Sequence, residues 1–214
     1  MRILLVFASQ PEAESFESEK ASKHNHTIDI LVTGIGIVPT IFELQNKLNS
    51  ATYDLVINAG IAGSFSAELA LGETVLVCND IFADYIIEDK EVKAIHDTNL
   101  RAMLPIELRR GWLMPQSLPF PFTSDLKQVI AITSNRISGT EQGIGLKKEL
   151  FAAQIETMEG AAVFYVCIKM NIPVIQLRSI SNYIEIRNTN NWKIKEALNA
   201  MNWELLKIIE KFIR

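Results

Sequence analysis

The chain has 214 residues, a hydrophobic fraction of 48%, a mean hydropathy of +0.14 and a formal net charge of −4. This length allows one large domain with a well-buried core, and the apolar content is typical of a sheet covered by helices on both faces. The acidic balance, with scattered Lys and Arg, argues against a nucleic-acid or anionic-membrane surface. No apolar run in the sequence reaches the roughly 18 residues that a membrane-spanning helix requires.

Apolar runs rich in β-forming residues recur along the chain and predict six strands. Several are continuous rather than alternating, which is typical of buried parallel strands. The first run is too short for a secretory signal, so we interpret it as a strand and not as a targeting segment. The predicted strands are 2–8, 27–33, 55–59, 74–80, 128–134 and 173–179.

Four further segments have helical spacing: 38–50, 145–151, 159–170 and 192–213. The last places Leu198, Met201 and Leu205 near one face, with charged residues on the other. Alternating strands and helices predict an α/β/α layered fold. We expect a single domain over residues 1–214, interrupted at about 88–127 by an irregular, proline-containing excursion. Such an excursion could be a lid or a subunit contact.

The cysteines and histidines do not indicate a metal or redox site. Cys78 and Cys167 lie far apart in apolar contexts, and we interpret them as buried free thiols in a reducing cytoplasm. His24 and His26 lie in a polar stretch that predicts a loop, without further ligands nearby. We therefore expect no metal and no cofactor, and a cytoplasmic location.

Two glycine-containing segments follow predicted strands. Gly34-Ile35-Gly36 lacks the third glycine of a dinucleotide fingerprint, because Pro39 stands in its place, and the chain has no P-loop motif. A glycine turn before a helix that begins near Pro39 explains this segment without a cofactor. Residues 58–64 end a strand with closely spaced small residues. They could form a simple turn, or a loop whose N–H groups meet a ribose or a phosphate.

Polar groups also fall where predicted strands end, at the edge where open α/β folds bind their ligands. Glu12 follows the first strand. It is either an exposed acid in the first turn of a helix or a carboxylate that holds and polarises water. The stretch Glu156-Thr157-Met158-Glu159-Gly160 follows a short apolar strand and leads into an apolar helix. A glutamate there could serve a ligand or simply complement the helix dipole.

The strand that starts near residue 173 ends in Arg178-Ser179-Ile180-Ser181-Asn182. An arginine at the end of a buried strand is costly unless it meets an acid or carbonyl groups. Asn182 offers both a donor and an acceptor, which suits the edge of a base. An asparagine in a turn is the open alternative.

In this order, these segments resemble the nucleoside phosphorylase/hydrolase superfamily. Within it they look like the methylthioadenosine/S-adenosylhomocysteine nucleosidases and, more closely, the futalosine hydrolases. The matching pieces span the chain apart from the excursion, and the most specific are residues 157–162, Thr-Met-Glu-Gly-Ala-Ala, and residues 178–182, Arg-x-Ile-Ser-Asn. The resemblance implies a three-layer α/β/α sandwich around a mixed central sheet. It also implies cleavage of the N-glycosidic bond of a purine nucleoside.

Roles for individual residues follow from the same resemblance. Glu12 would orient the attacking water, and Glu159 would bind the ribose hydroxyls. The side chain of Met158 would pack against the sugar. Arg178 would help to position the water or Glu12. Such groups suit the reaction, because a carboxylate near the sugar stabilises the oxocarbenium character that develops there.

The resemblance further implies that Asn182 hydrogen-bonds the purine at N7 and at its neighbouring exocyclic group. Relatives that act on adenine nucleosides have an aspartic acid here, whereas an asparagine suits a 6-oxopurine such as hypoxanthine. Gly60, Ile61 and Ser181 complete the expected substrate-binding set, although Ile61 replaces a polar residue common among the relatives. Residues near 138–144 are expected to face the base.

Hydrolysis of futalosine, with release of hypoxanthine in menaquinone biosynthesis, is therefore the leading hypothesis. The early loops offer no clear arginine for the phosphate clamp that phosphorolysis needs. The alternatives are a methylthioadenosine/S-adenosylhomocysteine-type nucleosidase, a purine nucleoside phosphorylase and a non-catalytic nucleoside-binding protein. We expect a small-molecule purine nucleoside as ligand, no nucleic-acid or membrane partner, and a homo-oligomer with a dimer favoured.

Overall fold

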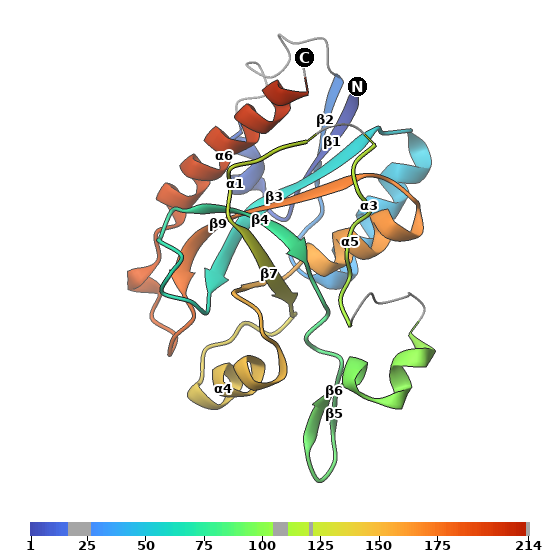
Figure 1. The fold of residues 1–214 in the computed structure, drawn as a ribbon. Coiled ribbons are helices and arrows are strands. Elements are labelled where there is room, and N and C mark those ends of the chain that lie inside the picture. Colours follow the sequence, from blue (N-terminus) through green and yellow to red (C-terminus); the bar gives the residue numbers. More distant parts are fainter. Residues whose placement is uncertain (17–26, 105–110, 120–121, 213–214) are drawn as a thin grey trace.

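The computed structural model describes residues 1–16, 27–104, 111–119 and 122–212. Within these ranges a central sheet is flanked by helices on both faces (Figure 1). Its strands are β1 (Arg2–Phe7), β2 (Thr27–Val32), β3 (Leu55–Ser64), β4 (Thr74–Asn79), β7 (Gln128–Thr133), β8 (Ile155–Thr157) and β9 (Val174–Tyr183). The α-helices are α1 (Gln10–Glu14), α3 (Ile37–Ser50), α4 (Glu141–Leu150), α5 (Gly160–Lys169) and α6 (Ile194–Lys211).

The sheet is mixed, as predicted, but it partly closes on itself. Its strand order is β2-β1-β3-β8-β7-β4-β9, and β9 also pairs with β3. The strands β3, β9, β4, β7 and β8 therefore form a closed circuit, from which β1 and β2 extend. Two of the pairings in the circuit, β3 with β8 and β4 with β9, are antiparallel. The sequence pattern predicted the layers, and the family resemblance implied the mixed sheet; neither predicted the closure.

The six predicted strands and four predicted helices are all present, with shifted ends. The largest differences are in β3 and β9, which continue to Ser64 and Tyr183 instead of ending near 59 and 179. The prediction that residues 58–64 form a turn or loop is therefore wrong. These two strands pair with each other in parallel beyond the predicted ends, so the ladder satisfies the backbone groups of their small residues. Asn182 likewise lies within β9 and not in a turn.

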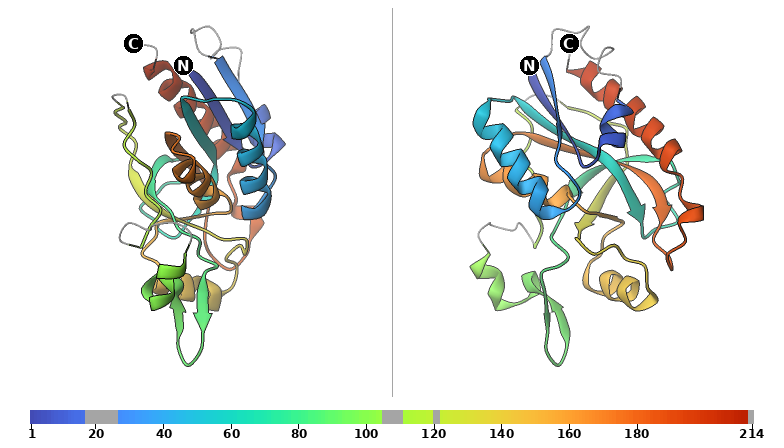
Figure 2. Two further views of the ribbon diagram at one scale, coloured as in Figure 1. Left: turned by 90° about the vertical axis from the view of Figure 1, so that its right-hand side faces the viewer. Right: turned by 180° about the vertical axis from the view of Figure 1, so that it is seen from behind.

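Two hydrophobic cores lie on opposite faces of the sheet. On β1, Leu4 and Val6 pack with buried residues of α3 and α5, whereas Ile3, Leu5 and Phe7 pack with α6 and the α1 segment. This alternation follows the two-residue period of a strand. The views in Figure 2 show α3 and α5 on one side of the sheet and α6 on the other. The expected three layers are therefore present.

The excursion at 88–127 contains more regular structure than the sequence suggests. A hairpin of β5 (Ile86–Glu88) and β6 (Val92–Ala94) forms its first part. Two 3-10 turns follow, η1 (Ile95–Asp97) and η2 (Asn99–Met103). These elements project from one end of the molecule (Figures 1 and 2). Residues 105–110 and 120–121 lie outside the described part of the excursion, and a role as lid or subunit contact stays a prediction.

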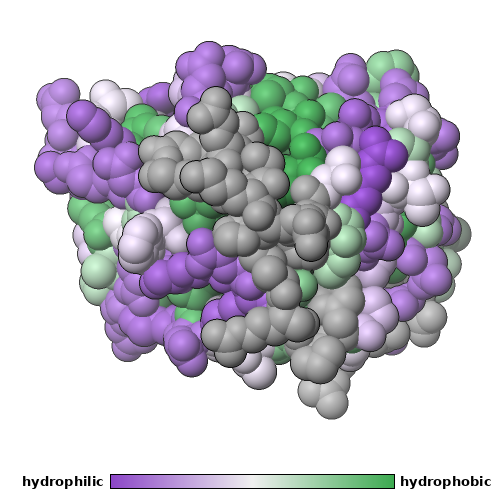
Figure 3. Space-filling model, turned by 90° about the horizontal axis from the view of Figure 1, so that it is seen from above, coloured by the Kyte–Doolittle hydropathy of each residue, from purple (hydrophilic) through white to green (hydrophobic). Residues whose placement is uncertain are grey.

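The start of β1 and the end of α6 lie at the same end of the molecule (Figure 1). Viewed from that end, hydrophobic residues lie between hydrophilic areas (Figure 3). The side chains that the sequence singled out, beginning with Glu12, follow the opposite end of β1. Among the helices of the described ranges, none is long and apolar enough to cross a membrane.

Candidate active site

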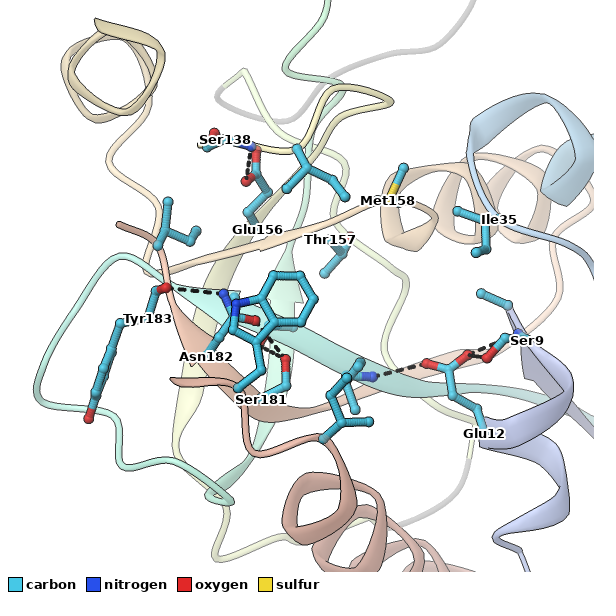
Figure 4. A pocket seen from close by; sticks show the side chains of 18 of the residues that line it. Ser9, Glu12, Ile35, Ser138, Glu156, Thr157, Met158, Ser181, Asn182 and Tyr183 are labelled. Atoms are coloured by element: carbon cyan, nitrogen blue, oxygen red, sulfur yellow. Dashed lines mark hydrogen bonds between the residues drawn. The ribbon is translucent and has the colours of Figure 1, made fainter. Parts of the chain in front are cut away.

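A cavity of about 380 Å³ lies where β1, β3, β8 and β9 end. This volume falls within the range of roughly 300–1,000 Å³ that small-molecule sites occupy. Figure 4 shows Glu12 and Ser9 on one side, Asn182 and Ser181 on the other, and Met158 along a further edge. Most of the predicted site residues line this cavity: Glu12, Ile61, Met158, Glu159, Ser181 and Asn182. Two others, Gly60 and Arg178, are not among its described lining residues.

Glu12 is buried, with 8% of its surface exposed, so the alternative of an exposed helix-start acid is wrong. It occupies the first turn of α1, and its Oε2 accepts hydrogen bonds from the Ser9 N–H and hydroxyl, each at 2.9 Å. Its Oε1 accepts from the Ile61 N–H at 3.2 Å. Three donors thus fix the carboxylate at the cavity wall and leave room for a further hydrogen bond at Oε1.

Gly60 lies beneath this carboxylate. A Cβ at Gly60 would stand 2.8 Å from Glu12 Oε1 and 3.5 Å from Nη1 of Arg178, so the close approach requires a residue without a side chain. Arg178 is the register partner of Gly60 on β9. Its guanidinium is 2% exposed and donates to the Leu177 carbonyl at 2.9 Å and to Oδ1 of Asn58.

The charge of Arg178 is surrounded by acids. Burial lowers the pKa of Arg178, and the negative charges of Glu159, Glu12 and Asp80 oppose this shift. The guanidinium is not among the described lining residues of the cavity, and these carboxylates stabilise its charged form. Its Nε has no hydrogen-bond partner among the described residues.

Glu159 precedes α5 and points away from its own helix. Its Oε1 accepts from the Gly36 N–H at 2.9 Å, and no hydrogen bond caps α5 from this side chain. Gly36 has φ of 98°, a conformation that favours glycine and brings the turn between β2 and α3 to this carboxylate. Burial raises the pKa of Glu159, while the Gly36 N–H and the charge of Arg178 act in the opposite direction.

Buried hydroxyls set the position of α5 and hence of Glu159. The Thr157 Oγ1 accepts from the Gly160 N–H at 3.2 Å, and the Thr133 Oγ1 accepts from the Ala161 N–H at 2.8 Å. Thr133 in turn donates to Asp80 Oδ1 at 3.0 Å. Desolvation raises the pKa of the fully buried Asp80 to about 7. These side chains satisfy N–H groups that the first helical turn leaves without partners.

Asn182 lies on the far side of the cavity from Glu12 (Figure 4). Its Oδ1 accepts from the Ser181 hydroxyl at 2.8 Å, and its Nδ2 donates to the Tyr183 carbonyl at 3.1 Å. The contact with Tyr183 orients the amide, because a carbonyl can accept from Nδ2 but cannot donate to Oδ1. An amide nitrogen carries two hydrogens, so one of them stays available to a ligand.

The sequence interpretation gave no role to several residues of the cavity, among them Ser9, Trp192 and Glu156. Glu156 is 8% exposed and accepts from Ser138 N–H and hydroxyl. The signal for Glu156 was present, since it stands in the stretch that leads into α5. The helical pattern assigned Trp192 to the start of the last helix, whereas it lies in the segment before α6 and lines the cavity. Within the expected segment 138–144, Ser138 is the residue that lines the cavity.

The two thiols are not among the described lining residues of the cavity. Cys78 and Cys167 are free, as predicted; Cys167 is buried, which raises the pKa of its thiol, whereas Cys78 is only partly buried. In the described ranges, no group of three or more His, Cys, Asp and Glu residues is placed to hold a metal ion. His24 and His26 lie outside the described residues.

The family model of the Phosphorylase superfamily matches residues 7–214. The futalosine hydrolase of Thermus thermophilus is 28% identical over 184 residues, which cover 80% of this chain and 76% of that protein. A methylthioadenosine/S-adenosylhomocysteine nucleosidase of Buchnera aphidicola is 25% identical over 190 residues, which cover 86% of this chain and 73% of that protein.

Solved structures with the same fold include enzymes of both names. A methylthioadenosine/S-adenosylhomocysteine nucleosidase from Colwellia psychrerythraea, in complex with adenine, superposes with a TM-score of 0.76 at 18% identity, covering 99% of this chain and 95% of that one. The futalosine hydrolase of Helicobacter pylori has a TM-score of 0.72 at 18% identity, covering 99% and 98%. These relatives are nucleosidases, which confirms the predicted class of enzyme. The chain belongs to the Phosphorylase superfamily.

Proposed function

We propose that this protein hydrolyses the N-glycosidic bond of a 6-oxopurine nucleoside, with futalosine as substrate and hypoxanthine as the released base. The observation that carries the proposal is one cavity with two different sides. Buried Glu12 and Glu159 lie toward the ends of β1 and β8, and Asn182 lies across from Glu12 at the end of β9. The first side suits a sugar that becomes cationic, and the second suits a base that leaves with negative charge.

On the sugar side, Glu159 would accept hydrogen bonds from the ribose hydroxyls while its Oε1 keeps the Gly36 N–H. Glu12 would hold the attacking water through the free position at Oε1 and take its proton. Arg178, which is buried, would not touch the substrate, and its positive charge favours the ionised form of Glu159 against the effect of burial. Met158 also lines the cavity and would pack against the sugar.

On the base side, the available N–H of Asn182 would donate to N7 and the 6-oxo group of the purine. The Tyr183 carbonyl favours this orientation, because it can only accept and therefore requires Nδ2 as the donor. An amino group at C6 would place two donors against each other in a partly buried pocket, which costs roughly 1–3 kcal/mol. Asn182 therefore supports a 6-oxopurine over a 6-aminopurine substrate.

Hydrolysis is favoured over phosphorolysis by the charges of the cavity. Its described lining residues include four glutamates, Glu12, Glu156, Glu159 and Glu185. The one Lys or Arg among these lining residues, Arg187, is exposed and lies over the Trp192 ring. A phosphate dianion would need a clamp of cationic and backbone donors, which this wall does not offer.

A methylthioadenosine/S-adenosylhomocysteine-type nucleosidase is the second candidate, because proteins of that name match nearly as well as futalosine hydrolases do. An enzyme of that type would use the same chemistry at the sugar but would act on an adenine nucleoside instead of a 6-oxopurine nucleoside. A place in menaquinone biosynthesis, a cytoplasmic location, a homodimer and a single nucleosidase domain over residues 1–214 stay predictions.

Incubation of the purified protein with futalosine, with and without inorganic phosphate, tests the reaction type. Chromatography should show hypoxanthine and a free sugar in equal amounts under both conditions. A sugar 1-phosphate formed only with phosphate would identify a phosphorylase and contradict the proposal. Binding of futalosine without release of the base would identify a non-catalytic nucleoside-binding protein.

A further inference from the structure

Glu156 is a third buried carboxylate in the cavity, and it lies on the base side. On β3, Gly63 is the register partner both of Glu156 on β8 and of Asn182 on β9. Because neighbouring strands lie about 4.8 Å apart, the backbones of Glu156 and Asn182 are separated by roughly 10 Å across Gly63. Both side chains line the same cavity, and Figure 4 shows Glu156 beside Ser138.

The contacts of Glu156 are all with donors. Its Oε2 accepts from the Ser138 N–H at 3.1 Å, and its Oε1 accepts from the Ser138 hydroxyl at 3.0 Å and from the Lys147 ammonium. The side chains of Glu156 and Lys147 are only 7% and 11% exposed. An ionised carboxylate has about four acceptor positions, so three protein donors leave one position at Oε2 for a ligand.

A carboxylate with one free acceptor position can distinguish 6-oxopurines from 6-aminopurines by the hydrogen-bonding character of their N1 atoms. A 6-oxopurine carries a hydrogen on N1 and is a donor there, whereas the N1 of a 6-aminopurine is an acceptor. We propose that Glu156 is a specificity-determining residue that accepts the N1–H of a 6-oxopurine and repels the N1 lone pair of a 6-aminopurine. This inference rests on the proposed function, and adds to Asn182 a second residue that reads the base.

A purely structural role is the competing explanation. Lys147 belongs to α4, so the Glu156–Lys147 pair also ties that helix to β8. A tether of this kind would affect stability and the activity on every substrate alike. A residue that reads N1 would instead change the ratio between 6-oxo and 6-amino substrates.

The test compares wild type with Glu156→Gln on futalosine and on its 6-amino analogue. The amide can donate to the N1 of the 6-amino substrate and loses the charge-assisted bond to N1–H. We expect kcat/KM for futalosine to fall roughly 10- to 100-fold and the 6-oxo to 6-amino ratio to fall by at least about 10-fold. Glu149→Gln, the same change at an exposed position of α4, is the matched control and should leave the ratio unchanged.

Wild-type protein provides a second readout that does not depend on turnover or on the folding of a variant. Calorimetry with free bases should show that 1-methylhypoxanthine, which lacks N1–H, binds at least about 10-fold more weakly than hypoxanthine. Equal losses on both substrates in Glu156→Gln, or equal binding of the two bases, would overturn the role of Glu156. Absence of futalosine cleavage together with selective hypoxanthine binding would overturn the proposed reaction and leave the role of Glu156 supported.

Discussion

Replacement of Glu12 by glutamine separates the basic carboxylate from the shape of its side chain. In the proposed reaction Glu12 takes a proton from the attacking water, and general-base assistance of this kind contributes about 10²- to 10⁴-fold to the rate. We therefore expect kcat of Glu12→Gln to fall by a factor within that range. Binding of hypoxanthine should change little, because Asn182 and Ser181 lie on the other side of the cavity.

The same change has a structural cost, which follows from the contacts of Glu12. Its two oxygens accept from Ser9 and from the Ile61 N–H, and an amide can replace only one of these acceptors. Two opposed donors in a buried place cost roughly 1–3 kcal/mol. Since folded domains are stable by about 5–15 kcal/mol, the variant should fold with a lower melting temperature.

The assay is base release at saturating futalosine, followed by chromatography, with thermal unfolding of the same preparations. Glu14→Gln is the matched control, because Glu14 is exposed on the same helix. It should keep both kcat and melting temperature. A Glu12→Gln variant that folds and retains kcat within about threefold of wild type would refute water activation by Glu12, because the general-base contribution is far larger.

Three further changes probe other parts of the site. Gly60→Ala should push Glu12 from its position, since the added Cβ would stand 2.8 Å from Oε1, and normal kcat would contradict the role of this contact. Asn182→Asp should raise the 6-amino to 6-oxo ratio of kcat/KM, because a protonated Asp can donate to N7 and an ionised one can accept from the 6-amino group; an unchanged ratio would mean that another residue reads this edge. The pKa of Asp80 is about 7 in the folded state, against about 3.9 in an unfolded chain. Between these two values the folded state binds one proton more than the unfolded state. The stability of the protein should therefore fall as pH rises from about 4 to 7. Asp80→Asn should flatten this dependence in urea unfolding at pH 4.5 and 7.5, and parallel curves for the two proteins would contradict the assignment.

The sequence was sufficient for the layers of the fold, and most of the residues that it singled out as candidates line one cavity. Continuous apolar runs marked the strands, because strands buried on both faces lack polar positions. Glu12, Glu159 and Asn182 were found because each stands at or beyond the end of such a run. Groups at the ends of neighbouring strands are expected to meet at one edge of the sheet. The side chains of Glu12, Glu159 and Asn182 do meet there, because all three line the same cavity.

The remainder depends on contacts between distant segments. The pairing of β3 with β9 extends both strands through residues that favour turns locally, including Gly60, Gly63 and Asn182. Closure of the strand circuit through β8 requires three residues, Ile155–Thr157, which are too few to show a period. The place of Glu156 opposite Asn182 follows from that closure, so no spacing in the sequence could reveal it.

The ratio of kcat/KM for futalosine and its matched 6-amino analogue, measured on the wild-type protein, tests the central claim most directly. The two substrates share the sugar and differ only at the purine edge that Asn182 and Glu156 face. Discrimination by sites built to hydrogen-bond a substrate group can reach several orders of magnitude, and we predict a preference for futalosine of at least about 100-fold. An equal rate on both, or a preference for the 6-amino substrate, would contradict recognition of a 6-oxopurine and favour a methylthioadenosine/S-adenosylhomocysteine-type nucleosidase.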